Sequence, residues 1–151
     1  MANFREITPG FFVAAQLDED DLERAAKMGF RSVIINRPDG EGGEDQPGCV
    51  EMSKAATARG LGTHYLPVRG FQITDSENVE AFAKILEASE APVLAYCKSG
   101  TRSAMLWAQV KVCELGIEAV LAMCLKAGYD LEILRDELED ILAQEQALNA
   151  A

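Results

Sequence analysis

The chain has 151 residues, of which 48% are apolar, and its 14 basic and 25 acidic residues give a formal net charge of −11. We expect a single domain over residues 1–151 that buries roughly 70% of its unfolded surface. The negative charge argues against nucleic acid and against an anionic membrane as partners. No apolar run approaches the length that spans a bilayer, and residues 1–6 lack the layout of an export signal. We therefore expect a cytoplasmic location with reduced thiols.

The first half of the chain alternates short strands with helices. Residues 7–14 predict a small hairpin around Pro9-Gly10, because proline fixes one φ and glycine readily adopts φ > 0. Asp18 is placed to cap a helix that ends at Gly29. A β-branched run then predicts a central strand over residues 32–36, followed by a helix over 49–58 and a strand over 63–68.

The second half continues this alternation and ends in helices. Thr74 and Glu77 form a capping-box pattern for the next helix, and Pro92 interrupts the chain after it. A strand over residues 93–96 precedes three predicted helices, over 102–115, 117–126 and, capped by Asp130, about 131–147. This order predicts an α/β fold of three layers, with a mostly parallel sheet and helices on both of its faces.

Cys97 stands between a buried strand and a helix. The candidate substrate-binding residues follow it directly: Lys98, Ser99, Gly100, Thr101, Arg102 and Ser103. Unpaired N–H groups and partial positive charge at a helix start make such a loop typical of an anion-binding cradle. We expect the cradle to lower the pKa of the Cys97 thiol, and Arg102 to close the ring around an oxyanion. The pattern predicts a cysteine nucleophile; the alternative is a buried cysteine before an ordinary helix cap at Ser103.

The spacing within this loop separates two kinds of enzyme. Four residues lie between Cys97 and Arg102. Cysteine-dependent phosphatases have a loop that resembles this one, but with five residues between the cysteine and the arginine. Rhodanese-type sulfurtransferases have four, often with a basic residue after the cysteine and a glycine in the middle, as Lys98 and Gly100 are here. The spacing therefore favours sulfur transfer.

Basic residues follow three of the predicted strands. Because parallel strands end at one edge of a sheet, the loops after Asn36, Val68 and Tyr96 should meet there. We expect their basic residues to gather beside Cys97 and to attract a small anion despite the net charge; these are Arg37, Arg69, Lys98 and Arg102. The alternative for the first two is a solvated loop charge.

A long, acidic, glycine-rich loop covers residues 36–48, and a loop of this length is more often functional than idle. Its glycines do not form a dinucleotide fingerprint, because Asp45 takes the place of the third glycine. Asp39 in this loop is a candidate general acid or base, although a turn-forming role is favoured. Asp75 is the second candidate for protonating a leaving oxygen, and a role at the start of its helix is favoured.

Two further residues have a chemical and a structural interpretation. Cys49 lies in the first turn of its helix, where it could act as a resolving thiol, but a packing cysteine is favoured. His64 is the only histidine, and a hydrogen-bonded structural role is favoured. The four cysteines lack metal-ligand spacing, so we expect no metal and no cofactor. The oligomeric state stays open between a monomer and a small homo-oligomer.

Five stretches up to about residue 129 combine into a specific pattern: Gly29-Phe30-Arg31-Ser32-Val33-Ile34, Asn36-Arg37-Pro38-Asp39-Gly40-Glu41, Leu66-Pro67-Val68, Ile73-Thr74-Asp75 and the cysteine loop through Ser103. The pattern resembles the phosphatase-like domain found fused to some beta-lactamase-like hydrolases. That family is described as containing sulfurtransferases or phosphatases. It is similar in fold to dual-specificity phosphatases, which implies a four- or five-stranded sheet with Cys97 at its centre.

Three functions are compatible with this sequence. In the favoured one, Cys97 takes sulfane sulfur from thiosulfate or a persulfide and passes it to a thiol or cyanide. No strong general acid is needed there, because sulfite and thiolates leave as stable anions. In the second, Cys97 attacks a phosphate monoester and Asp75 or Asp39 protonates the leaving oxygen. The third is an anion-binding regulatory module.

Overall fold

The computed structural model describes residues 1–150 and is built around a five-stranded sheet in the order β1-β2-β5-β3-β4. Strand β1 runs antiparallel to β2, and the other neighbouring strands are parallel. This confirms the predicted mostly parallel α/β sheet. The strands are β1 Arg5–Thr8, β2 Phe11–Ala14, β3 Ser32–Ile35, β4 Gly62–Tyr65 and β5 Val93–Tyr96.

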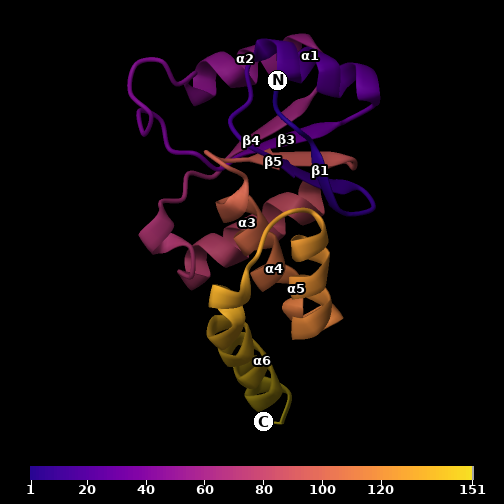
Figure 1. The fold of residues 1–151 in the computed structure, drawn as a ribbon, viewed down its shortest axis with the longest axis vertical. Coiled ribbons are helices and arrows are strands. Elements are labelled where there is room, and N and C mark those ends of the chain that lie inside the picture. Colours follow the sequence, from indigo (N-terminus) through magenta and orange to yellow (C-terminus); the bar gives the residue numbers. More distant parts are fainter. Residues whose placement is uncertain (151) are drawn as a thin grey trace.

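Helices cover both faces of the sheet, as predicted (Figure 1). Helices α1 and α2 lie on one face, and the other helices lie on the opposite face. The helices are α1 Glu19–Met28, α2 Cys49–Ala58, α3 Ser76–Ala88, α4 Thr101–Leu115, α5 Ile117–Lys126 and α6 Arg135–Ala150, with 3-10 turns η1 Gly70–Gln72 and η2 Glu132–Leu134.

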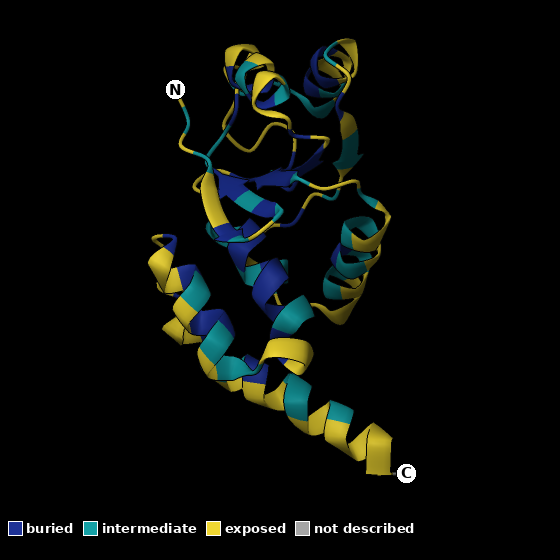
Figure 2. Ribbon diagram, turned by 90° about the vertical axis from the view of Figure 1, so that its right-hand side faces the viewer, coloured by how far each residue is buried: buried dark blue, intermediate teal, exposed yellow. Residues whose placement is uncertain are grey.

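Alternation along the central strands creates two separate hydrophobic cores. Side chains of a strand point to opposite faces in turn. Leu94 and Tyr96 of β5 therefore pack with α1 and α2, whereas Val93 and Ala95 pack with the helices on the other face. The buried strands form the middle layer in Figure 2. The last residue of β5 is thus fixed by packing just before Cys97.

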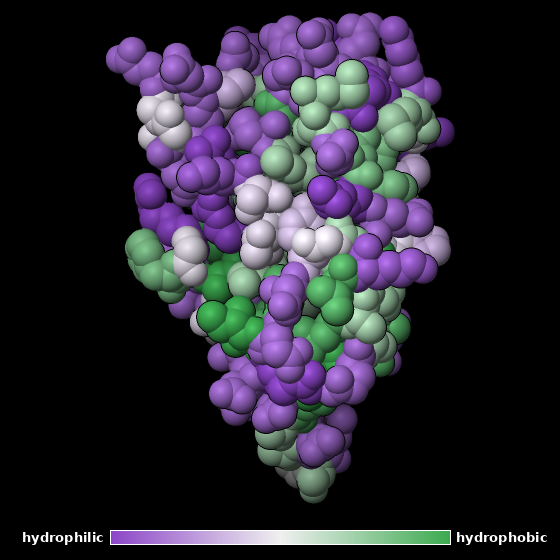
Figure 3. All heavy atoms as spheres, viewed as in Figure 1, coloured by the Kyte–Doolittle hydropathy of each residue, from purple (hydrophilic) through white to green (hydrophobic). Residues whose placement is uncertain are grey.

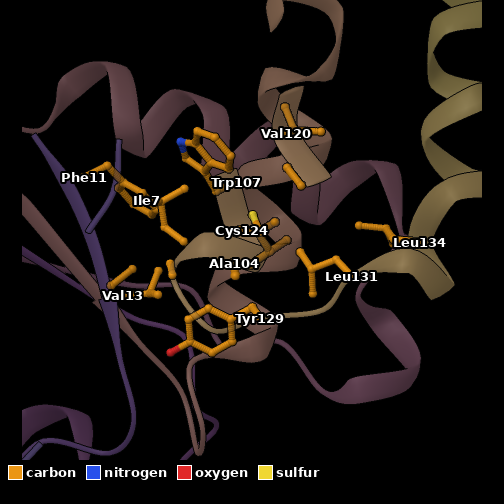
Figure 4. Packing of buried hydrophobic residues seen from close by; sticks show 14 of the residues in the cluster. Ile7, Phe11, Val13, Ala104, Trp107, Val120, Cys124, Tyr129, Leu131 and Leu134 are labelled. Carbon is orange, nitrogen blue, oxygen red and sulfur yellow. The ribbon is translucent and has the colours of Figure 1, made fainter. Parts of the chain in front are cut away.

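The larger core joins the sheet to α4 and α5 (Figure 4). Trp107 of α4 is fully buried and stacks on Phe11 of β2, with ring centroids 6.0 Å apart. Phe82 of α3 meets the same Phe11 ring edge-on. Aromatic pairs of this kind stabilise beyond their buried area. The packing fixes the direction of α4, whose first residues belong to the cysteine loop.

The N-terminal half follows the sequence prediction closely. Strands β1 and β2 form the hairpin around Gly10, which has φ +89°. Asp18 caps α1 through a capping box with Asp21, and Gly29 ends this helix in the left-handed conformation with φ +98°. Each feature depends on residues close in sequence, which is why it could be predicted from local chemistry.

Three boundaries differ from the prediction. Strand β4 ends at Tyr65 rather than residue 68, because Pro67 has no N–H to donate to the ladder. The N–H of Val68 still donates to the carbonyl of Asn36, just after β3. The capping box of Thr74 and Glu77 is absent, and Asp75 occupies the N-cap position of α3 instead. The last helix is preceded by a 3-10 turn that begins where Asp130 accepts a bond from a nearby N–H.

None of the helices in residues 1–150 combines the length and the apolar composition that crossing a membrane requires.

Candidate active site

Three loops are tied together at the carboxyl ends of β3, β4 and β5 by one buried side chain. The amide of Asn36 donates through Nδ2 to the carbonyl of Leu66 (2.9 Å) and accepts at Oδ1 from the hydroxyl of Ser103 (2.8 Å). Its backbone N–H bonds to the carbonyl of Tyr96 (2.9 Å). Asn36 and Ser103 are both fully buried. A satisfied buried network of this kind fixes geometry, so the start of α4 is held against both neighbouring loops.

Cys97 follows β5 and lies beneath the loop that leads into α4. Its residue exposure is 0%, and the backbone N–H of Gly100 points at its sulfur with a distance of 3.1 Å from N to Sγ. The N–H groups in the first turn of α4 have no intrahelical carbonyl partners. The sulfur therefore faces the positive end of a helix.

Gly100 is required by the shape of this loop. Its φ of +95° lies in the left-handed region, and an added Cβ would collide with the Tyr129 hydroxyl and approach the carbonyl of Ala14 to 3.2 Å. That hydroxyl donates to the carbonyl of Ser99 at 3.2 Å. In Figure 4 the oxygen of Tyr129 points out of the hydrophobic cluster. Tyr129 thus closes the loop from the side of the larger core.

Arg102 is held by an acidic side chain from the glycine-rich loop. Glu41 accepts from Nη1 (2.9 Å) and Nη2 (2.6 Å) of the guanidinium, and the carbonyl of Val68 accepts the second Nη1 proton (2.8 Å). An arginine has five N–H donors. Subtracting these three bonds leaves Nε–H and one Nη2–H, an adjacent pair that fits two oxygens of a phosphate or sulfate.

The guanidinium of Arg102 lies near the cysteine. The pKa of the guanidinium is raised chiefly by its hydrogen bond to Glu41; burial opposes this, and the Cys97 sulfur adds a smaller increase. Only 14% of the Arg102 side chain is exposed. Glu41 therefore orients the arginine through Nη1 and Nη2, close enough to Cys97 for the sulfur to affect the guanidinium.

Arg37 shares the same carboxylate. Its Nε donates to Glu41 at 3.1 Å, and its Nη1 donates to the side chain of Gln16 at 3.2 Å. The hydrogen bond from Arg102, followed by that from Arg37, outweighs desolvation and lowers the pKa of Glu41 to about 2. The carboxylate is therefore ionised over the whole physiological range.

Two of the four predicted basic residues share one acidic partner. Arg37 and Arg102 converge on Glu41, whereas Lys98 and Arg69 are exposed. Arg69 precedes η1, and its backbone N–H donates to Gln72. Among the other loop residues, the hydroxyl of Ser99 lies 3.0 Å from that of Thr101.

Asp39 and Cys49 are partners of each other. Asp39 Oδ1 accepts from the backbone N–H of Cys49 (2.8 Å), and its Oδ2 accepts from the thiol (3.1 Å). Burial, followed by the bond to Asp39, raises the pKa of Cys49. Both oxygens of Asp39 thus serve the start of α2, and the thiol of Cys49 points at a carboxylate.

Asp75 occupies a different environment. It is exposed at the N-cap of α3 and makes no capping bond with its side chain. It lines a hollow between α3 and α6, while its neighbour Thr74 lines both this hollow and the pocket that contains Arg102. His64 lines a separate hollow with Ser32 and Glu90, and Arg102 is not part of its lining.

No group of three or more His, Cys, Asp or Glu side chains suited to hold a metal ion occurs within residues 1–150.

Comparison with known proteins places this chain in a family. Residues 3–113 match the family model of the beta-lactamase hydrolase-like protein, phosphatase-like domain. The matched residues include the cysteine loop and the loop that carries Glu41. The chain belongs to this phosphatase-like domain family. The resemblance expected from the sequence motifs is thereby confirmed.

Curated relatives are longer than this chain. The beta-lactamase hydrolase-like protein of Xylella fastidiosa (strain Temecula1) is 35% identical over 128 residues, which cover 83% of this chain and 29% of that protein. The protein of the same name from Agrobacterium fabrum is 38% identical over 95 residues, which cover 63% and 22%. This phosphatase-like domain thus spans less than a third of the curated relatives that it matches.

Solved structures share the fold. A candidate phosphatase from Neisseria meningitidis Z2491 has a TM-score of 0.81 and 30% identity, with 91% of this chain and 96% of that chain covered. Kinase associated phosphatase, with its catalytic-site cysteine replaced by serine, has a TM-score of 0.67 and 15% identity (95% and 96%). PTPMT1 in complex with PI(5)P has a TM-score of 0.64 and 17% identity (94% and 98%). These likenesses confirm the predicted dual-specificity-phosphatase-like fold.

Sequence reasoning missed three residues that shape the candidate site. Glu41 was part of a recognised motif, but no local pattern indicates that it reaches Arg102, 61 positions away. Asn36 could have been recognised, because a side-chain amide directly after a buried strand needs hydrogen-bond partners. Tyr129 lies beyond the family match, and its bond to Ser99 depends on how the later helices fold back.

Proposed function

We propose that this phosphatase-like domain hydrolyses phosphate monoesters through Cys97. The observation that carries the proposal is the guanidinium of Arg102, held near Cys97 by Glu41 and Val68, which leave two adjacent N–H donors unused. Membership of a phosphatase-like family supports it. The sulfurtransferase interpretation favoured by the four-residue spacing gains no such support, and the phosphatase alternative is the better one.

The reaction would proceed in two displacements. The Cys97 thiolate attacks phosphorus, the bond from phosphorus to the leaving oxygen breaks, and that oxygen takes a proton from a carboxylic acid. Water then attacks the phosphocysteine, the S–P bond breaks, and the carboxylate takes a proton from the water. Donors of Arg102 and the loop amides stabilise the charge on the phosphoryl oxygens in both steps.

Of the two predicted acids, Asp75 suits this role better. Asp39 is occupied at both oxygens by Cys49, so it would have to leave the start of α2. Asp75 is exposed, makes no capping bond and follows Thr74, which lines the pocket of Arg102. We assign Asp75 as the general acid and Glu41 as a positioning residue.

The test is a paired assay of the purified chain. Release of inorganic phosphate from an aryl phosphate is measured beside transfer of sulfur from thiosulfate to cyanide, with wild type, Cys97→Ser and Cys113→Ser. Cys113 is exposed on α4 and serves as the matched control. We expect phosphate release that is lost only in Cys97→Ser. Sulfur transfer dependent on Cys97 without phosphate release would overturn the proposal.

A further inference from the structure

A pocket of about 630 Å³ opens directly beside Arg102. Its lining comes from three elements and one loop: Gly70, Ile73 and Thr74 around η1, Thr101, Arg102 and Met105 of α4, Ile133 and Leu134 of η2, and Glu41. The volume lies within the range of small-molecule sites. The pocket thus shares Thr101 and Arg102 with the candidate anion site, while the buried Cys97 lies outside its lining.

The pocket is polar at one end and apolar over the rest. The only charged groups in its lining are Arg102 and Glu41, which pair with each other, so they offer no net charge to a ligand. The remaining polar side chains are two threonines, whereas Ile73, Met105 and Ile133 supply apolar surface. Figure 3 shows hydrophobic residues gathered beside the start of α6.

The two apolar residues from η2 differ in their roles. Leu134 is buried in the larger core, with 4% exposure, and anchors this turn. Ile133 is 86% exposed, which is unusual for a large aliphatic side chain next to a polar site. Both residues lie beyond the stretch 3–113 that matches the family model. This side of the pocket is therefore built by a segment that the family pattern does not define.

We propose that this pocket is the leaving-group subsite and that the substrate is a small phosphomonoester with an apolar leaving group. The inference rests on the proposed phosphatase function. The phosphoryl group would lie on the cysteine loop and the free donors of Arg102, and the apolar group would extend over Met105 toward Ile133. A strongly charged leaving group would find no partner there except the charges that already neutralise each other.

The test measures binding rather than turnover. Dissociation constants of n-alkylphosphonates of increasing chain length are determined by calorimetry with the intact chain, its Ile133→Ser variant and the matched control Leu148→Ser. Leu148 is also apolar and 77% exposed, but it lies near the end of α6 outside this lining. Alkylphosphonates keep the anionic group constant and cannot be hydrolysed.

We expect affinity to rise with chain length by up to about fourfold per methylene until the pocket is filled. The increase per methylene should be smaller in Ile133→Ser and unchanged in Leu148→Ser. Binding that is independent of chain length would overturn the subsite but leave the phosphatase proposal standing. If no phosphonate binds and no phosphate ester is hydrolysed, the proposed function itself fails.

Discussion

At the scale of residues, the site depends on how Glu41 holds two arginines. The carboxylate binds one pair of donors on Arg102 and also accepts from Arg37. Such a residue does not touch the reacting atoms, but it decides where the guanidinium lies. Small displacements of a group that stabilises a transition state reduce rates strongly.

Replacement of Glu41 by Gln should therefore lower kcat/KM for an aryl phosphate by up to about 100-fold. The amide keeps the size of the side chain but loses the charge that orients both arginines. Glu44 in the same loop is exposed and provides the control Glu44→Gln, which should retain wild-type kinetics. Equal kinetics of the two variants would show that Arg102 is oriented without Glu41.

The same carboxylate predicts a specific acid sensitivity. Its pKa falls from 4.5 to about 2 on folding, so the native state favours the ionised form. This stabilisation is complete above pH 4.5 and is lost as the pH falls toward 2. We expect wild type to exceed Glu41→Gln by about 1–3 kcal/mol in free energy of unfolding at pH 7. Urea denaturation at several pH values should show this difference shrinking below pH 4.5, and a constant difference would contradict the assignment.

Asp75 predicts a dependence on the leaving group. If this residue protonates the leaving oxygen, Asp75→Asn should slow hydrolysis of an alkyl phosphate by about 100-fold or more. A nitrophenyl phosphate, whose leaving group needs little protonation, should be affected far less. Steady-state kinetics of Asp75→Asn and Asp39→Asn with both substrates make the comparison. Selective loss in the Asp39 variant would transfer the role to Asp39.

At the scale of elements, the junction of β5 and α4 depends on Gly100. Its left-handed conformation and its contact with Tyr129 both exclude a side chain. Gly29 at the end of α1 has a similar φ of +98° but open space around its Cβ position. Substitution of Gly29 therefore introduces backbone strain alone, whereas substitution of Gly100 introduces both backbone strain and a steric collision.

Gly29→Ala should cost about 1 kcal/mol of stability, because only the backbone is strained. Gly100→Ala should cost more, on the order of 2–4 kcal/mol, and should also reduce catalysis because the loop must move away from Tyr129. Chemical denaturation and phosphate-release assays measure both effects. Equal stability losses with wild-type activity in Gly100→Ala would show that the loop is not confined as described.

At the scale of the whole molecule, the sequence predicted what depends on local patterns. The alternation of strands and helices, the caps at Asp18 and Gly29, and the position of Cys97 at a strand end all follow from neighbouring residues. The long-range partners of the cysteine loop could not be predicted in this way. Glu41 and Tyr129 reach it from 61 and 30 positions away, and such contacts depend on the finished topology rather than on periodicity.

The orientation of the four basic side chains could not be predicted from the sequence either. Topology correctly brought their loops to one edge of the sheet, but it could not tell which side chains turn inward. Arg37 turns inward because Glu41 and Gln16 accept its protons, whereas Arg69 and Lys98 remain exposed. The proposed anion site is therefore built on one oriented arginine, a helix start and a cysteine, with Arg69 and Lys98 exposed nearby in the chain.

The most direct test of the central claim is to identify the group that Cys97 carries during turnover. The chain is mixed with an aryl phosphate, quenched rapidly at a pH that preserves thiophosphate esters, and analysed by peptide mass spectrometry beside a thiosulfate-treated sample. We predict a phosphoryl adduct confined to the peptide containing Cys97. A sulfane-sulfur adduct on Cys97 after thiosulfate, with no phosphoryl adduct in the first sample, would contradict the account.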